Sequence, residues 1–103
     1  MELITKELEE VFLKFPFGSQ EGKGMKAKVI VKYFAPVGSA TWLVTEAEKN
    51  ENGDWELFGY AKIHDWEWGY ALLSELQEIK LPFGLGIERD LYLDDDDTVE
   101  SCI

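Results

Sequence analysis

The stretch TWLVTEAEKNENGDWELFGYAKIHDWEWGYAL, residues 41–72, decides the fold. It holds three runs rich in β-branched and aromatic residues, which predict strands at 41–45, 55–63 and 66–72. The first turn contains Asn52-Gly53, a dipeptide that is among the strongest signals for a β-hairpin. Strands that follow one another without a helix between them pair as neighbours, so this stretch predicts an antiparallel meander.

A further strand is predicted just before this stretch, at 26–34. Apolar and basic residues alternate there, so that one face carries Ala27, Val29, Val31 and Tyr33 and the other carries Lys26, Lys28 and Lys32. Such a period of two indicates a half-buried strand, here with a basic outer face. A short last strand is predicted at 91–93.

Two short helices are predicted on either side of these strands. In residues 5–14 apolar side chains recur every three or four positions, Thr5 is a suitable N-cap, and Pro16 ends the helix. Residues 74–77 read Ser-Glu-Leu-Gln, which fits a capping box at the start of a second helix. The sequence therefore predicts an α+β fold, an antiparallel meander of four to five strands with two short helices packed on one face.

The length of 103 residues allows one domain. We predict that residues 1–93 form a single globular α+β domain and that residues 94–103 form an acidic, flexible C-terminal tail. The first residues lack the basic and apolar regions of a signal peptide, and a single cysteine, Cys102, is typical of a reducing compartment. We therefore expect a cytoplasmic protein.

The charge is unevenly distributed along the chain. The net charge of −11 arises entirely in residues 51–103, which hold 3 cations and 14 acids, whereas residues 1–50 hold 7 lysines and 7 glutamates. Proteins bind duplex DNA and anionic membranes through cationic groups, so neither is an expected partner. The asymmetry instead predicts a cationic partner that approaches the acidic part of the molecule.

No enzyme signature is present. The only histidine is His64, which excludes a catalytic triad and a histidine-rich metal site. Gly84-Leu85-Gly86 lacks the remaining residues of a nucleotide-binding loop. The sequence therefore predicts a protein that is not an enzyme, with no cofactor and no metal site.

Two clusters admit more than one interpretation. The run Asp94, Asp95, Asp96 and Asp97 is either a solvated tail, a cation site or a mimic of nucleic-acid phosphates, because extended carboxylates repeat at about the phosphate spacing. Trp66, Trp68 and Tyr70 are expected on one strand face as part of the core. If exposed, they would form a binding hot spot for a cationic partner, or line a pocket together with Asp65 and Glu67.

Several motifs are shared with a known family. They are Gly59-Tyr60, Trp66-Glu67-Trp68-Gly69-Tyr70, Ser74-Glu75-Leu76 and residues 81–91, LPFGLGIERDL. By these motifs residues 1–93 resemble small proteins of phages and mobile elements that are classed as a domain of unknown function. Within that group they look like the type II-A anti-CRISPR proteins, which inhibit the RNA-guided effector nuclease. The resemblance carries over no catalytic or metal-binding residues.

The resemblance implies a non-enzymatic inhibitor whose partner is the type II-A effector nuclease, alone or with its guide RNA. Its candidate contacts form an acidic surface of Glu75, Glu78, Glu88, Asp90, Asp94, Asp95, Asp96 and Asp97. A second candidate is a basic face toward the guide RNA, made by Lys26, Lys28 and Lys32. The alternative function is a small ligand-binding or enzymatic domain of a mobile element, with a pocket formed by Asp65, Trp66, Glu67, Trp68 and Tyr70.

Overall fold

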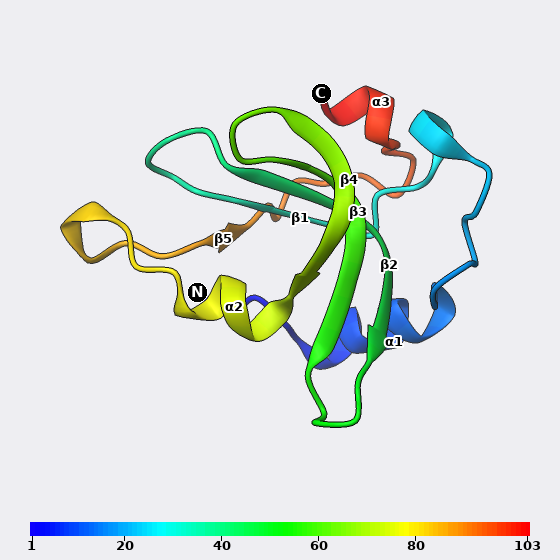
Figure 1. Ribbon diagram of the computed structural model, residues 1–103, viewed down its shortest axis with the longest axis horizontal. Helices are drawn as coiled ribbons and strands as arrows, with labels where there is room; N and C mark the ends of the chain where they lie inside the picture. Colours follow the sequence, from blue (N-terminus) through cyan, green and yellow to red (C-terminus); the bar gives the residue numbers. More distant parts are fainter.

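The computed structural model describes all residues, 1–103. The strands are β1 (Val31–Phe34), β2 (Thr41–Lys49), β3 (Trp55–Lys62), β4 (Trp66–Leu72) and β5 (Glu88–Arg89). The helices are α1 (Lys6–Lys14), α2 (Leu73–Glu78) and α3 (Val99–Cys102), with short 3-10 turns η1 (Gly24–Lys26) and η2 (Pro82–Gly84). Figure 1 shows how these elements follow one another in space.

The five strands form one antiparallel sheet in the order β4-β3-β2-β1-β5. The α+β class and the meander of four successive strands are therefore as predicted. The strand expected at 26–34 begins only at Val31, and Ala27 and Val29 lie in a different apolar cluster from Val31 and Tyr33. The last strand was expected at 91–93, which is wrong, because β5 pairs with β1 at Glu88 and Arg89. Just beyond it, the Asp90 carboxylate accepts from the Tyr92 backbone N–H at 2.8 Å, a turn that leads the chain away from β1.

Both predicted helices pack on the same face of the sheet. The Thr5 hydroxyl caps α1 by accepting from the Leu8 N–H at 3.1 Å. On the buried side of α1, Phe12 lies edge-on against Trp55, with ring centroids 5.1 Å apart. Helix α2 adds Leu73 and Leu76 to the same apolar core. The main core therefore lies between these helices and the sheet.

The N-terminus is fixed to this core through Tyr33. The Tyr33 side chain is fully buried in the sheet, and its hydroxyl donates to the Leu3 carbonyl at 2.6 Å. Burial raises the pKa of this phenol far above its ordinary value, opposed only in part by Arg89. The hydroxyl therefore stays protonated and keeps its donor role over the whole physiological pH range.

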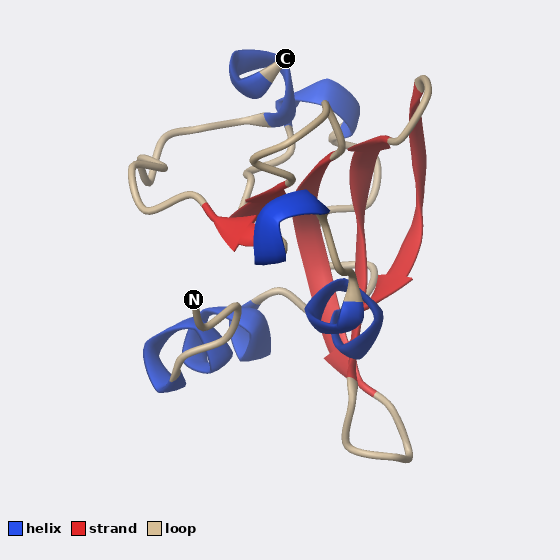
Figure 2. Ribbon diagram, turned by 90° about the vertical axis from the view of Figure 1, so that its left-hand side faces the viewer, coloured by secondary structure: helices blue, strands red, loops and turns tan.

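A second, smaller cluster lies on the other face of the sheet. It contains Ala27, Val29, Leu43 and Val99, all buried. Leu43 alternates along β2 with Trp42 and Val44, which face the main core, so α3 covers the opposite face. Figure 2 shows α3 near the C-terminus, well apart from α1 at the N-terminus.

The prediction of a flexible tail at 94–103 is wrong, because this segment is part of the packed domain. The Val29 N–H donates to the Asp97 carbonyl, and the Val99 N–H donates to the Ala27 carbonyl, each at 3.0 Å. A β-bridge joins Lys28 to Thr98, and the Val99 side chain is completely buried. The apolar residue inside an acidic segment thus fixes the segment to the sheet.

Val99 should contribute measurably to stability. Replacing Val99 by Ala removes two buried methyl groups, and we expect a loss of about 1.6 kcal/mol at ~0.8 kcal/mol for each group. Urea denaturation followed by fluorescence would measure this change. Ile103→Ala is the control, because that side chain is 58% exposed and its loss should change stability by less than about 0.5 kcal/mol. Equal effects of the two variants would contradict the docked position of the segment.

Candidate functional site

An aromatic strip lies on the sheet face that α1 and α2 leave uncovered. We use this name for Phe17, Phe58, Tyr60, Trp66, Trp68 and Tyr70. The pairing of β3 with β4 sets Phe58 opposite Tyr70 and Tyr60 opposite Trp68. Because side chains alternate along a strand, these residues and Trp66 share one face. The hairpin therefore concentrates the aromatic residues of two strands on a single surface.

The rings of the strip are in contact with one another. Tyr60 stacks on Trp66 with centroids 5.2 Å apart and planes 9° from parallel, and Phe58 stacks on Trp68 at 5.7 Å and 18°. Phe17, from the loop after α1, meets Tyr70 edge-on at 5.5 Å. Such contacts hold each ring in a fixed place without covering it, so the surface is rigid before any partner binds.

The prediction that the aromatic side chains of β4 belong to the core is wrong. Trp68 is 39% exposed and Tyr70 is 69% exposed, and Trp66 is half-buried beside the smaller cluster. The reason is that β4 is an outer strand of the sheet and that α3 reaches only the Trp66 end of it. Trp42 and Trp55, by contrast, are buried.

Acidic side chains border the strip at its end near the β2–β3 turn. Glu48 lies directly opposite Glu56, and both share the face that carries Phe58. Like charges directly opposite each other on a sheet are unfavourable, and a cation between them removes the repulsion. The exposed Glu48 and half-buried Glu56 therefore favour a cationic group beside the aromatic rings.

Glu48 Oε1 also accepts from the Phe17 N–H at 3.2 Å, and a third carboxylate on this face, Glu46, is engaged more fully. It lies at a β-bulge in β2 and is buried, and its oxygens accept from the Gly18 N–H at 2.9 Å and the Gln20 N–H at 2.8 Å. These bonds hold the loop after α1 beside the strip. A groove of about 330 Å³ lies between that loop and Phe58, Trp68 and Tyr70.

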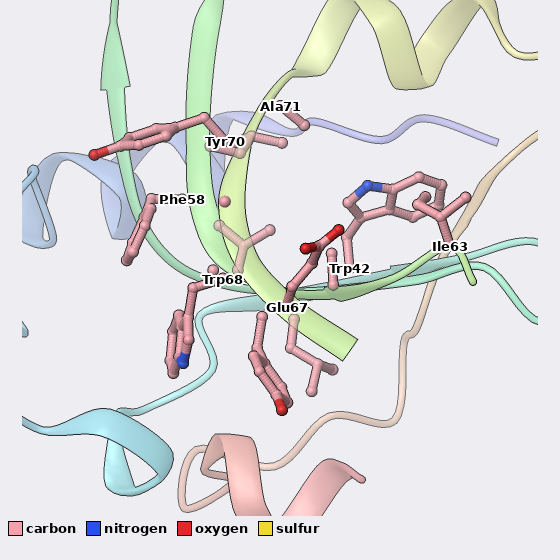
Figure 3. Close-up of a pocket in the computed structure, with 14 residues that line it drawn as sticks. Trp42, Phe58, Ile63, Glu67, Trp68, Tyr70 and Ala71 are labelled. Atoms are coloured by element: carbon pink, nitrogen blue, oxygen red, sulfur yellow. The ribbon is translucent and has the colours of Figure 1, made fainter. Parts of the chain in front are cut away.

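The pocket predicted from Asp65, Trp66, Glu67, Trp68 and Tyr70 assembles only in part. Glu67, Trp68 and Tyr70 border one hollow, but their side chains do not share one face of the sheet. Glu67 alternates with the two tryptophans and faces the other side of β4, and Asp65 lies exposed in the turn before it. On that other side, Gly59 and Gly69 pair and leave a hollow of about 260 Å³ near Trp42, Ile63 and Glu67. Figure 3 shows Phe58, Trp68 and Tyr70 on one side of the ribbon and Trp42 and Ile63 on the other.

The predicted acidic surface separates into three groups. Glu75 and Glu78 lie on α2, where Glu75 Oε1 accepts from the Leu72 N–H at 3.1 Å. Glu88 and Asp90 lie at β5, and Asp90 forms an ion pair with Lys32 at 3.8 Å. The remaining members, Asp94, Asp95, Asp96 and Asp97, form the turn before α3.

Asp97 has a structural role within that turn. Its carboxylate accepts from the Asp94 backbone N–H at 2.9 Å and from the Ser101 hydroxyl at 3.0 Å. These hydrogen bonds lower the pKa of the Asp97 carboxyl, the bond to the Asp94 backbone most of all. Asp97 is therefore a local turn and cap residue, and the outward acids of the run are Asp94, Asp95 and Asp96.

The predicted basic face lies beside this acidic turn instead of forming a separate surface. Lys32 pairs with Asp90, and the Lys28 ammonium donates to the Asp95 backbone carbonyl. Of the three lysines only Lys26, at the end of η1, has no such partner. The net positive charge that these lysines could offer to an RNA is thus smaller than the sequence predicts.

Almost the whole chain matches one protein family. Residues 3–102 match the family model DUF2958, described as a protein of unknown function. The chain belongs to this family. The DUF2958 match includes the four aspartates, whereas the resemblance drawn from the motifs ends near residue 93. No curated protein and no solved structure matches the chain.

Other features of this DUF2958 protein bear on its chemistry. No three His, Cys, Asp or Glu side chains are grouped so that they could hold a metal ion, and no helix is long and apolar enough to cross a bilayer. Burial raises the pKa of the Cys102 thiol, and so do the nearby carboxylates of Asp97 and Asp90, which disfavours the reactive thiolate.

Three members of the aromatic strip, Phe17, Phe58 and Tyr60, are absent from the residues predicted to bind. A signal for two of them is present in the sequence. Phe58 and Tyr60 stand two positions apart in β3, as Trp66, Trp68 and Tyr70 do in β4, and a hairpin aligns such patterns. Phe17 carries no such signal, because the bond of its own N–H to Glu48 and the bonds of the next loop residues to Glu46 determine its place.

Proposed function

We propose that the protein is a non-enzymatic inhibitor of the RNA-guided effector nuclease of type II-A CRISPR systems. It acts in the cytoplasm of the bacterial host cell and binds the nuclease, alone or with its guide RNA. Binding blocks the target DNA or a later step of cleavage. The observation that carries the proposal is the exposed, pre-ordered aromatic strip with Glu48 and Glu56 beside it, on a molecule of net charge −11.

The chemistry of the strip suits the basic surfaces of such a nuclease. The channels that hold nucleic acid in these enzymes are positively charged and read the backbone of the heteroduplex. Arginine and lysine side chains bind the faces of Trp and Tyr, and a neighbouring carboxylate strengthens that contact. Trp, Tyr and Arg are also the residues that dominate binding energy at protein interfaces.

The acidic residues away from the strip act over a longer range. Glu75, Glu78, Glu88, Asp94, Asp95 and Asp96 contribute to a field that attracts a cationic channel and speeds association. With 21 acids, 10 Lys and Arg, and one ion pair within the molecule, most carboxylates are available to a partner. An exposed pair at 4 Å contributes about 1 kcal/mol in water, so several contacts add usefully to the hot spot.

The proposal is tested with purified nuclease, guide RNA and labelled target DNA. The protein is added either before or after the DNA, and both DNA binding by gel shift and DNA cleavage are measured. We expect inhibition when the protein is added first, and binding that weakens as salt rises from about 0.01 M to about 1 M, because exposed charge pairs are screened. Inhibition of cleavage with DNA already bound would assign the effect to the later step.

Undiminished cleavage at excess protein would contradict the proposal. The remaining candidate would then be a ligand-binding or enzymatic domain that uses the hollow beside Gly69. That hollow is mainly apolar and has one carboxylate, Glu67, at its lining. It offers a small site without the paired carboxylates that acid–base hydrolysis requires.

A further inference from the structure

We infer that β4 is a self-association edge, at which β4 of a second copy of this chain adds antiparallel and extends the sheet. The inference concerns the edge of the sheet and is independent of the proposed function, which uses the aromatic face. It follows from the unpaired backbone of β4, from the absence of the usual edge protection, and from the match of β4 with itself.

The backbone of β4 offers hydrogen bonds on its outer side. The Leu72 N–H is bonded to Glu75 Oε1 and not to β3, so it points outward from the sheet. In an antiparallel pair, alternate residues point toward the neighbour and away from it. Trp66, Trp68 and Tyr70 therefore direct their N–H and C=O groups outward, where no protein group binds them.

This edge has few of the features that keep sheets from pairing. Edge strands are usually very short, carry lysine or proline, or contain a bulge. The opposite edge follows that rule, since β5 has 2 residues. Strand β4 has 7 residues with neither lysine nor proline, its one charged side chain is Glu67, and the bulge of this sheet lies in β2.

Gly69 supplies a separate argument for close approach by another chain. Its φ is not positive, and a Cβ built on it would meet nothing within 4 Å. Neither a turn nor contact within the chain therefore requires glycine there. A glycine that weakens the middle of a strand without an internal reason marks a place where another chain comes near.

One register of two β4 strands pairs compatible side chains throughout. With Trp68 opposite Trp68 of the second copy, Trp66 lies opposite Tyr70 and Glu67 lies opposite Gly69. The same register sets Asp65 opposite Ala71, so no two acids face each other. The aromatic rows of the two copies become continuous, and Gly69 leaves room for the facing glutamate. This self-complementarity is the reason for a second copy as the occupant of the edge.

The charge of the molecule sets the salt dependence. Two copies of net charge −11 repel each other, and salt screens that repulsion. Self-association should therefore strengthen as salt rises from about 0.01 M to about 1 M, over which the Debye length falls from ~30 Å to ~3 Å. Nuclease binding has the opposite expected dependence, so the two processes are separable in one set of buffers.

The test is sedimentation velocity over a range of protein concentrations and salt. We expect a reversible monomer–dimer equilibrium that Trp68→Lys weakens about tenfold or more, because two like charges then face each other at the centre of the pairing. Leu13→Lys is the matched control. It adds the same charge at a side chain on α1 that is 72% exposed, and it should not weaken the dimer.

A second measurement on the unmodified protein identifies the mode of pairing even if Trp68→Lys does not fold. Amide hydrogen exchange by NMR should show slower exchange of the Trp68 and Tyr70 N–H groups at high concentration. The Gly69 and Ala71 N–H groups already face β3 and should change little. A protein that stays monomeric at all concentrations and salts would overturn the inference. A dimer without protection of the Trp68 and Tyr70 amides would overturn it as well.

Discussion

Replacing Trp68 by Ala should weaken nuclease binding by about 30-fold or more. The ring stacks on Phe58 at 5.7 Å and contacts Tyr60 at 5.1 Å, so it is held at the middle of the aromatic strip with its outer face open. Truncation of such a central, pre-ordered Trp costs about 2 kcal/mol or more at protein interfaces. That loss corresponds to the stated change in dissociation constant. Titration of the nuclease–guide complex by calorimetry would measure it.

The control for Trp68→Ala is Leu13→Ala. Both side chains are large, apolar and exposed, but Leu13 lies on α1, away from the strip. We expect the Leu13 variant to bind and inhibit normally. Urea unfolding of both variants establishes that any loss of binding by Trp68→Ala exceeds its effect on stability. Full inhibition by Trp68→Ala would show that the strip is not part of the interface. The acidic residues elsewhere would then be the remaining candidates for nuclease contacts.

Replacing Gly59 by Ala should destabilise the fold by about 3 kcal/mol. A Cβ at this position would lie 2.0 Å from the Leu43 carbonyl oxygen and 2.8 Å from its carbon, both of them backbone atoms of β2. No side-chain rotation can relieve contacts with backbone, so β2 and β3 must move apart beside the bulge. Forced overpacking of this kind costs about 1–3 kcal/mol and sometimes more.

The Gly59 prediction has a matched control in its cross-strand partner. Gly69 pairs with Gly59 in the ladder between β3 and β4, yet a Cβ on Gly69 meets open space. Gly69→Ala should therefore change the free energy of unfolding by less than about 1 kcal/mol, and loss of backbone freedom in the unfolded chain favours stabilisation. Denaturant unfolding of the two variants would measure both changes in the free energy of unfolding. Similar stabilities would show that β2 and β3 do not approach so closely at Gly59.

The sequence predicts the sheet well, because each of its signals is local. Alternation in β3 and β4, the Asn-Gly turn and the cap at Thr5 act over a few residues, and all lie where expected. The last strand at 91–93 was wrong because β5 depends on a distant pairing with β1 and on the turn at Asp90. No local pattern distinguishes Glu88–Arg89 from its neighbours.

The sequence predicts which residue types form the candidate site, but not how exposed their side chains are. A row of Trp66, Trp68 and Tyr70 at period two shows which side chains share a face, but not whether another element covers that face. Coverage depends on β4 being an outer strand and on the short reach of α3, and both are properties of the whole fold. The basic and acidic residues illustrate the same limit, since Lys32 and Asp90 are far apart in sequence and meet only through β1 and β5.

The docking of residues 97–99 against Ala27 and Val29 has a consequence for how the protein is made. The smaller apolar cluster contains chain segments from both halves, and Val99 completes it. On the ribosome, β1 to β4 emerge and can pair while the place of Val99 is still open to solvent. The ribosome adds about 5–20 residues per second, and domains fold as units while they are made. This cluster therefore closes last. A nascent chain halted before residue 99 would expose Val29 and Leu43, and such a chain is a natural substrate for chaperones.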